Sequence, residues 1–115
     1  MNVNSIKGGT NCNFKAGIHT DALEKMVTCA KAENKLGELI NVEKVVKDFS
    51  NRDLFIDYHK GLDRFIYTDK TMPGLAISLK GKNLMEQILG INKESMKVAN
   101  ECLLNKKQGT FELFA

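Results

Sequence analysis

Residues 53–69, with the sequence DLFIDYHKGLDRFIYTD, constrain the fold more than any other part of the chain. Two runs rich in aromatic and β-branched residues flank Lys60-Gly61, and a glycine supplies the positive φ that a tight turn requires. The pattern predicts a β-hairpin centred on these two residues. With that centre, Asp57 is expected opposite Arg64 as a favourable cross-strand pair.

The predicted hairpin has two different faces, because side chains alternate along a strand. One face is largely apolar and is expected to meet the core: Leu54, Ile56, Tyr58, Phe65 and Tyr67. The other face is more polar: Phe55, Asp57, His59, Leu62, Arg64 and Ile66. Most of the groups in this chain that are suited to chemistry are therefore expected around one turn.

Two helical patterns precede the hairpin. Asp21-Ala-Leu-Glu24 has the spacing of a capping box, and we expect Gly37 to end or kink the helix that it opens. A second helix is expected after Asn41. Apolar residues recur with helical spacing in both segments, which predicts that they share one core: Leu23, Met26, Val27 and Ala30, then Val42, Val45, Val46 and Phe49.

The second half of the chain has clear boundary signals. They predict a turn at 71–74, a strand at 75–79, a helix from Asn83 to Gly90, a helix capped by Asn92, and a strand at 110–114. The expected order is α-α-β-β-β-α-α-β. It indicates a single α+β domain over residues 1–115, loop-rich at 1–18, with a mainly antiparallel sheet and helices packed on one face.

Composition narrows the class of protein. Seventeen Lys and Arg against fourteen Asp and Glu give a net charge of +3, which is too mild to indicate nucleic-acid binding by itself. The three cysteines form no C-x-x-C pair, and the two histidines and three cysteines lack the spacing of a metal site. No apolar run approaches the roughly 20 residues of a membrane span. We expect a soluble cytoplasmic protein without a cofactor and without a membrane partner.

One alternative function is that of a metal-free ribonuclease of the small toxin type. Such catalysis needs a general base, a general acid and a cation for the phosphate. On the polar face of the hairpin, His59 and Asp57 could exchange protons and Arg64 could hold the phosphate. RNA would then be the partner. His19 is a second histidine that could contribute.

A third alternative concerns Cys12. The segment Gly8-Gly-Thr-Asn-Cys12 resembles the glycine-rich approach to the nucleophile in papain-like cysteine hydrolases and deamidases, over about five residues. The resemblance implies a Cys12 thiolate nucleophile with His59 as its base and Asp69 as the group that orients the histidine.

The first expectation is a small binding or regulatory module that is not an enzyme. It would act through an exposed sheet face or strand edge, and its partner would be a protein. Aromatic and arginine side chains dominate binding hot spots, so the expected contact residues are Tyr58, Lys60 and Arg64.

Overall fold

The computed structural model describes residues 17–107. Its elements are α1 (Thr20–Ala32), α2 (Leu36–Asp48), β1 (Leu54–His59), β2 (Arg64–Asp69), β3 (Ala76–Ser78), α3 (Leu84–Leu89) and α4 (Lys93–Lys107). The α+β class and the order α-α-β-β-β-α-α are confirmed. The strand expected at 110–114, the residue Cys12 and most of the loop-rich segment 1–18 lie outside the described residues.

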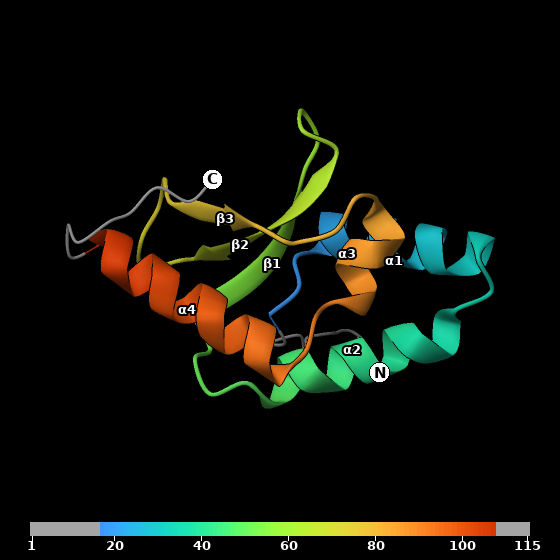
Figure 1. Ribbon diagram of the computed structural model, residues 1–115, viewed down its shortest axis with the longest axis horizontal. Coiled ribbons are helices and arrows are strands. Elements are labelled where there is room, and N and C mark those ends of the chain that lie inside the picture. Colours follow the sequence, from blue (N-terminus) through green and yellow to red (C-terminus); the bar gives the residue numbers. More distant parts are fainter. Residues whose placement is uncertain (1–16, 108–115) are drawn as a thin grey trace, which may run out of the picture.

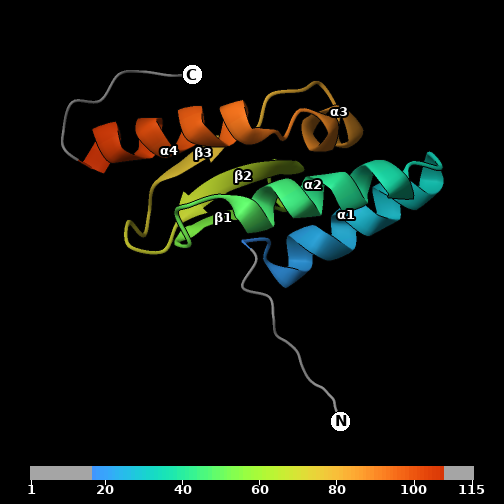
Figure 2. The same cartoon turned by 90° about the horizontal axis from the view of Figure 1, so that it is seen from below.

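The three strands form one antiparallel sheet in the order β1-β2-β3. Figure 1 shows the strands in the upper part of the molecule, with α4 and α2 below them. Figure 2 shows α4 and α1 on opposite sides of the molecule, with α2 between them in that view. Burial follows the expected alternation, because Leu54, Ile56, Phe65 and Tyr67 are buried whereas Phe55 and Ile66 are half-buried.

The register of the hairpin differs from the predicted one by two residues. Asp57 pairs with Ile66, and Arg64 pairs with His59, so the expected Asp57–Arg64 pair is wrong. The turn contains four residues rather than two, and the positive φ of 54° falls on Asp63 instead of Gly61. A shift of two residues leaves every side chain on its original face, which is why the predicted faces survive.

The boundary between the first two helices also differs. His19 occupies the N-cap position of α1 without a side-chain cap bond, and Asp21 lies inside the first turn, so the predicted capping box is wrong. Asn34 adopts a positive φ of 58° in the connection that follows α1. Gly37 and Asn41 therefore both lie within α2, which begins earlier than predicted.

The shared core of these two helices is confirmed. Met26, Ala30, Val42 and Val46 are buried in one cluster. The other expected residues pack against it while remaining partly exposed: Leu23, Val27, Val45 and Phe49.

The caps of the last two helices were predicted correctly. Asn83 Oδ1 accepts the backbone N–H of Glu86 at 2.9 Å, and Asn92 Oδ1 accepts that of Ser95 at 2.8 Å. Gly90 is the C-cap of α3. These boundaries place the loop 79–83 and α3 beside the first residues of β2.

Candidate functional site

Three segments that are distant in sequence surround an open groove beside the hairpin turn. They are the C-terminal end of α1, the turn itself and the loop that leads into α3. The groove has a volume of about 640 Å³ and is lined by Cys29, Ala32, Glu33, Leu62, Asp63, Arg64, Lys82, Asn83, Leu84, Met85 and Gln87. This volume lies within the range of roughly 300–1,000 Å³ that ligand pockets occupy.

Arg64 lines the groove with a guanidinium group that is fixed in place. Its Nε donates to Ser78 Oγ at 2.7 Å, and its Nη2 donates to the carbonyls of Leu79 at 2.5 Å and Gly81 at 3.0 Å. These bonds tie the start of β2 to the end of β3 and to the loop before α3. Among the described residues, nothing accepts a hydrogen bond from Nη1.

Gln87 is the most buried polar residue of the groove, with 1% of its surface exposed. Its Oε1 accepts the backbone N–H of Phe65 at 2.9 Å, which identifies Nε2 as the donor end of the amide. No acceptor for Nε2 is found within residues 17–107. Gly81 has a φ of 138°, and a Cβ there would lie 2.7 Å from the Gln87 backbone nitrogen, so the loop requires glycine at this position.

The α1 side of the groove is more acidic. Burial raises the pKa of the Cys29 thiol, Lys25 partly opposes this shift, and the carboxylates of Glu33 and Asp63 add to it. Asp63 also accepts a hydrogen bond from the Tyr58 hydroxyl, and this bond is the main reason that the pKa of Tyr58 is raised. Cys29 is therefore held as a thiol rather than a thiolate.

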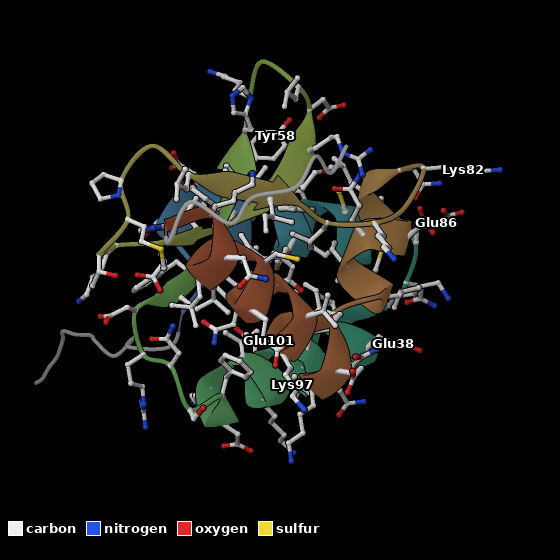
Figure 3. All side chains as sticks on the ribbon, turned by 60° about the vertical axis from the view of Figure 1, so that its left-hand side comes forward. Glu38, Tyr58, Lys82, Glu86, Lys97 and Glu101 are labelled. Atoms are coloured by element: carbon white, nitrogen blue, oxygen red, sulfur yellow. The ribbon has the colours of Figure 1, made fainter. Side chains whose placement is uncertain are left out.

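Tyr58 lies next to the groove but is not part of its lining. Its ring contacts Phe65 edge-on at a centroid distance of 5.7 Å, and Lys25 Nζ lies 5.2 Å from the ring centroid. Figure 3 shows Tyr58 on the hairpin, and Lys82 at the edge of the loop before α3 with its side chain reaching outward. Lys82 thus marks the outer rim of the groove.

The structure places the other predicted site residues around the turn without joining them. His59 is exposed, and its Nδ1 accepts the backbone N–H of Leu62 at 3.0 Å. Asp57 Oδ1 accepts the adjacent N–H of Tyr58 at 2.9 Å. Lys60 is exposed in the turn. Within the described part of the chain, no hydrogen bond or ion pair links His59 or Asp57 to Arg64, although His59 and Arg64 are cross-strand neighbours.

The two remaining predicted participants lie away from the groove. His19 stacks on Phe55 at a centroid distance of 4.6 Å. Asp69 pairs with Leu54, at the opposite end of the hairpin from His59, so it does not orient that histidine.

Of the residues that line the groove, sequence reasoning named only Arg64 as a site residue, and those that it missed include Cys29, Glu33, Lys82 and Gln87. They belong to segments that meet only in the folded chain. A usable signal was the Gly81–Asn83 segment, where a glycine two residues before an N-cap predicts a tight turn after the preceding strand.

Comparison of the chain with protein-family models, with curated proteins and with solved structures finds no match. Within residues 17–107, no three His, Cys, Asp or Glu side chains are grouped so that they could hold a metal ion. No helix of this part of the chain is long and apolar enough to cross a membrane.

Proposed function

We propose that this domain is a binding module, not an enzyme, and that it recognises a short segment of another protein in the groove beside the hairpin turn. The observation that carries the proposal is the convergence of three segments on one open groove with a mixed lining. Apolar side chains such as Leu62 and Leu84 lie there between basic and acidic groups. A partly apolar site with a few polar groups is typical of ligand recognition.

The side chains that could act in catalysis are not arranged for it, which favours a binding function. The raised pKa of Cys29 disfavours the thiolate that a nucleophile requires. His59 uses Nδ1 to hold the turn and does not line the groove, so it is not directed at a group bound beside Arg64. An acid, a base and a cation directed at one reacting atom would be needed for ribonuclease activity.

Selection from peptide libraries tests the proposal. One library presents random peptides with free carboxyl ends, and a second presents them with the carboxyl end fused to a carrier. Peptides selected by the wild-type protein are then measured by calorimetry against two variants. Ala32→Trp places a large ring in the groove, whereas Thr28→Trp places the same ring one turn earlier on exposed α1 surface.

We expect selected peptides to bind wild type and Thr28→Trp with equal affinity and to lose at least tenfold in affinity with Ala32→Trp. Peptides that bind all three forms equally would show that the groove is not the site. Failure to select any peptide from either library would also overturn the proposal. Cleavage of total RNA by the purified protein would replace it with the ribonuclease alternative.

A further inference from the structure

One side of the groove is rich in hydrogen-bond donors without acceptors. Within residues 17–107, no group accepts from Nη1 of Arg64 or from Nε2 of the buried Gln87, and both residues line the groove. A buried donor without an acceptor is costly, so a bound oxygen atom at this position would relieve that cost.

The donors of this side are also held in place before any ligand arrives. The three hydrogen bonds of Arg64 fix the plane of its guanidinium group, and the bond to Phe65 fixes the amide of Gln87. Nη1 of Arg64 is left to donate a charge-assisted hydrogen bond to a carboxylate oxygen, and donors that are already ordered lose less entropy on binding. Lys82 adds an exposed positive charge at the rim.

The other residues that line the groove indicate which chemical groups of the ligand lie next to its carboxylate. Leu62, Leu84 and Met85 offer apolar surface, and Glu33 and Asp63 place negative charge toward α1. Those two carboxylates disfavour a ligand with several negative charges, such as a phosphate ester or a nucleic acid. A single negative charge beside an apolar group, with neutral or basic groups behind it, complements the groove.

We propose that the groove recognises the free C-terminal carboxylate of a partner protein whose last side chain is apolar. The carboxylate binds on the side of Arg64 and Gln87, and the last side chain packs on the leucines and Met85. The preceding residues lead toward Glu33 and Asp63, where a basic side chain is favoured. This inference rests on the proposed function and names the part of the partner that is bound.

The test compares each peptide selected from the free-carboxyl library with the same peptide synthesised as a C-terminal amide. Calorimetry is performed on wild type and on two pairs of variants. Gln87→Glu keeps an oxygen for the Phe65 N–H but replaces the Nε2 donor with a negative oxygen. Lys82→Met removes the charge at the rim, and Lys80→Met is its control, an exposed lysine two residues away that does not line the groove.

We expect the amide to bind at least tenfold more weakly than the acid, as for a lost set of charge-assisted hydrogen bonds. Gln87→Glu should weaken binding of the acid by tenfold or more while changing the amide little. A loss of about two- to fivefold is expected for Lys82→Met, smaller at high salt, and none for Lys80→Met. A melting curve for each variant shows whether the domain is folded.

Equal affinity of acid and amide would overturn the carboxylate inference. Ligands obtained only from the fused library, and blocked by Ala32→Trp, would overturn it as well but would leave the groove as the binding site. Displacement of the acid by inorganic phosphate at similar concentration would show a general anion site instead. Failure to obtain any ligand that depends on the groove would remove both proposals.

Discussion

Strand β2 begins and ends with an ionisable side chain, and the two ends contrast sharply. Asp69, at the end, is 3% exposed. Its Oδ1 accepts from the backbone N–H and the hydroxyl of Thr71, and its Oδ2 accepts from the amide of Asn51. Asn51 in turn donates to Asn100 of α4 at 2.7 Å. Arg64, at the start, is half-buried and lines a groove.

The difference lies in how complete each polar cluster is. The Asp69 cluster joins β2, the segment before β1, the turn after β2 and α4 around a carboxylate that is itself buried. The Arg64 cluster joins the start of β2 to the end of β3 and to the loop before α3, and within residues 17–107 nothing accepts from Nη1 of Arg64, which lines the groove. Buried clusters with their hydrogen bonds satisfied fix a fold, whereas polar groups that stay accessible on a rigid scaffold are available for recognition.

The largest expected effect is at the closed end. Asp69→Ala removes a buried carboxylate that accepts three hydrogen bonds from Asn51 and Thr71, which should lower the free energy of unfolding by about 3 kcal/mol. The control is Asp53→Ala. Asp53 is 39% exposed and pairs with Lys70 at 3.7 Å, so its loss should cost about 0.5 kcal/mol or less.

Urea unfolding of both variants measures this difference. Similar losses for Asp69→Ala and Asp53→Ala would mean that the Asp69 cluster does not hold these segments together, and the contrast between the two ends of β2 would fail.

At the open end, Arg64→Met should cost less. It removes three hydrogen bonds, but Arg64 is partly exposed and water can solvate the carbonyls of Leu79 and Gly81, so we expect a loss of about 1–2 kcal/mol. Hydrogen exchange should quicken in residues 79–83 and stay unchanged around Asp69. Arg64→Lys should recover only part of the stability, because an ammonium group cannot reproduce the fork. Full recovery with lysine would show that charge alone matters here.

The strands of this sheet and the faces of their side chains could be predicted from the sequence. Side chains alternate between the two faces, so a register error of two residues leaves each side chain on the predicted face. Tyr58 and Phe65 were assigned to the core face with the wrong partners, and a shift of two residues left them there. The register was missed because glycine is the usual residue at positive φ, whereas here Asp63 adopts that conformation and Gly61 does not. Asn34 caused a similar error between α1 and α2.

The groove was not predictable from local patterns. His59, Arg64 and Asp57 attracted attention because they are close in sequence, yet the residues that gather around the groove come from α1, the turn and α3. Gln87 has no local signal, because a glutamine at a helical position is usually exposed. Its role becomes apparent only when its amide is found against the Phe65 N–H.

The two tyrosines of the chain ionise at high pH in two different surroundings, Tyr67 in the core and Tyr58 beside the groove. Burial raises the pKa of Tyr67, whose hydroxyl lies 3.3 Å from Ser95 Oγ, above the value of about 10 found in unfolded chains. The unfolded chain then loses its phenolic proton first. Stability from this residue is therefore complete below about pH 10 and falls as the pH rises through the folded pKa.

We expect wild type to lose more stability than Tyr67→Phe above about pH 10, although Tyr67→Phe costs about 0.5–1 kcal/mol at neutral pH. The pKa of Tyr58 is raised mainly by its hydrogen bond to Asp63, on the exposed side of the hairpin. Tyr58→Phe and Tyr67→Phe each leave a single tyrosine, so tyrosinate absorbance of the two variants measures the ionisation of each hydroxyl separately. Parallel loss of stability in wild type and Tyr67→Phe would show that burial of Tyr67 does not govern the alkaline response.

The smallest expected effect is that of His59→Ala, and it decides whether the open end is a binding or a catalytic region. His59 is exposed, and its only described role is to accept the Leu62 N–H, so stability should change by no more than about 0.5 kcal/mol. His59 does not line the groove, and affinity for selected peptides should also be unchanged.

If the hairpin instead catalysed RNA cleavage, removal of a general acid or base would reduce the rate by about 10²–10⁴-fold. Wild type and His59→Ala are therefore incubated with total RNA beside the peptide assay. Cleavage by wild type that disappears in a folded His59→Ala variant would place chemistry at the open end and contradict the binding proposal.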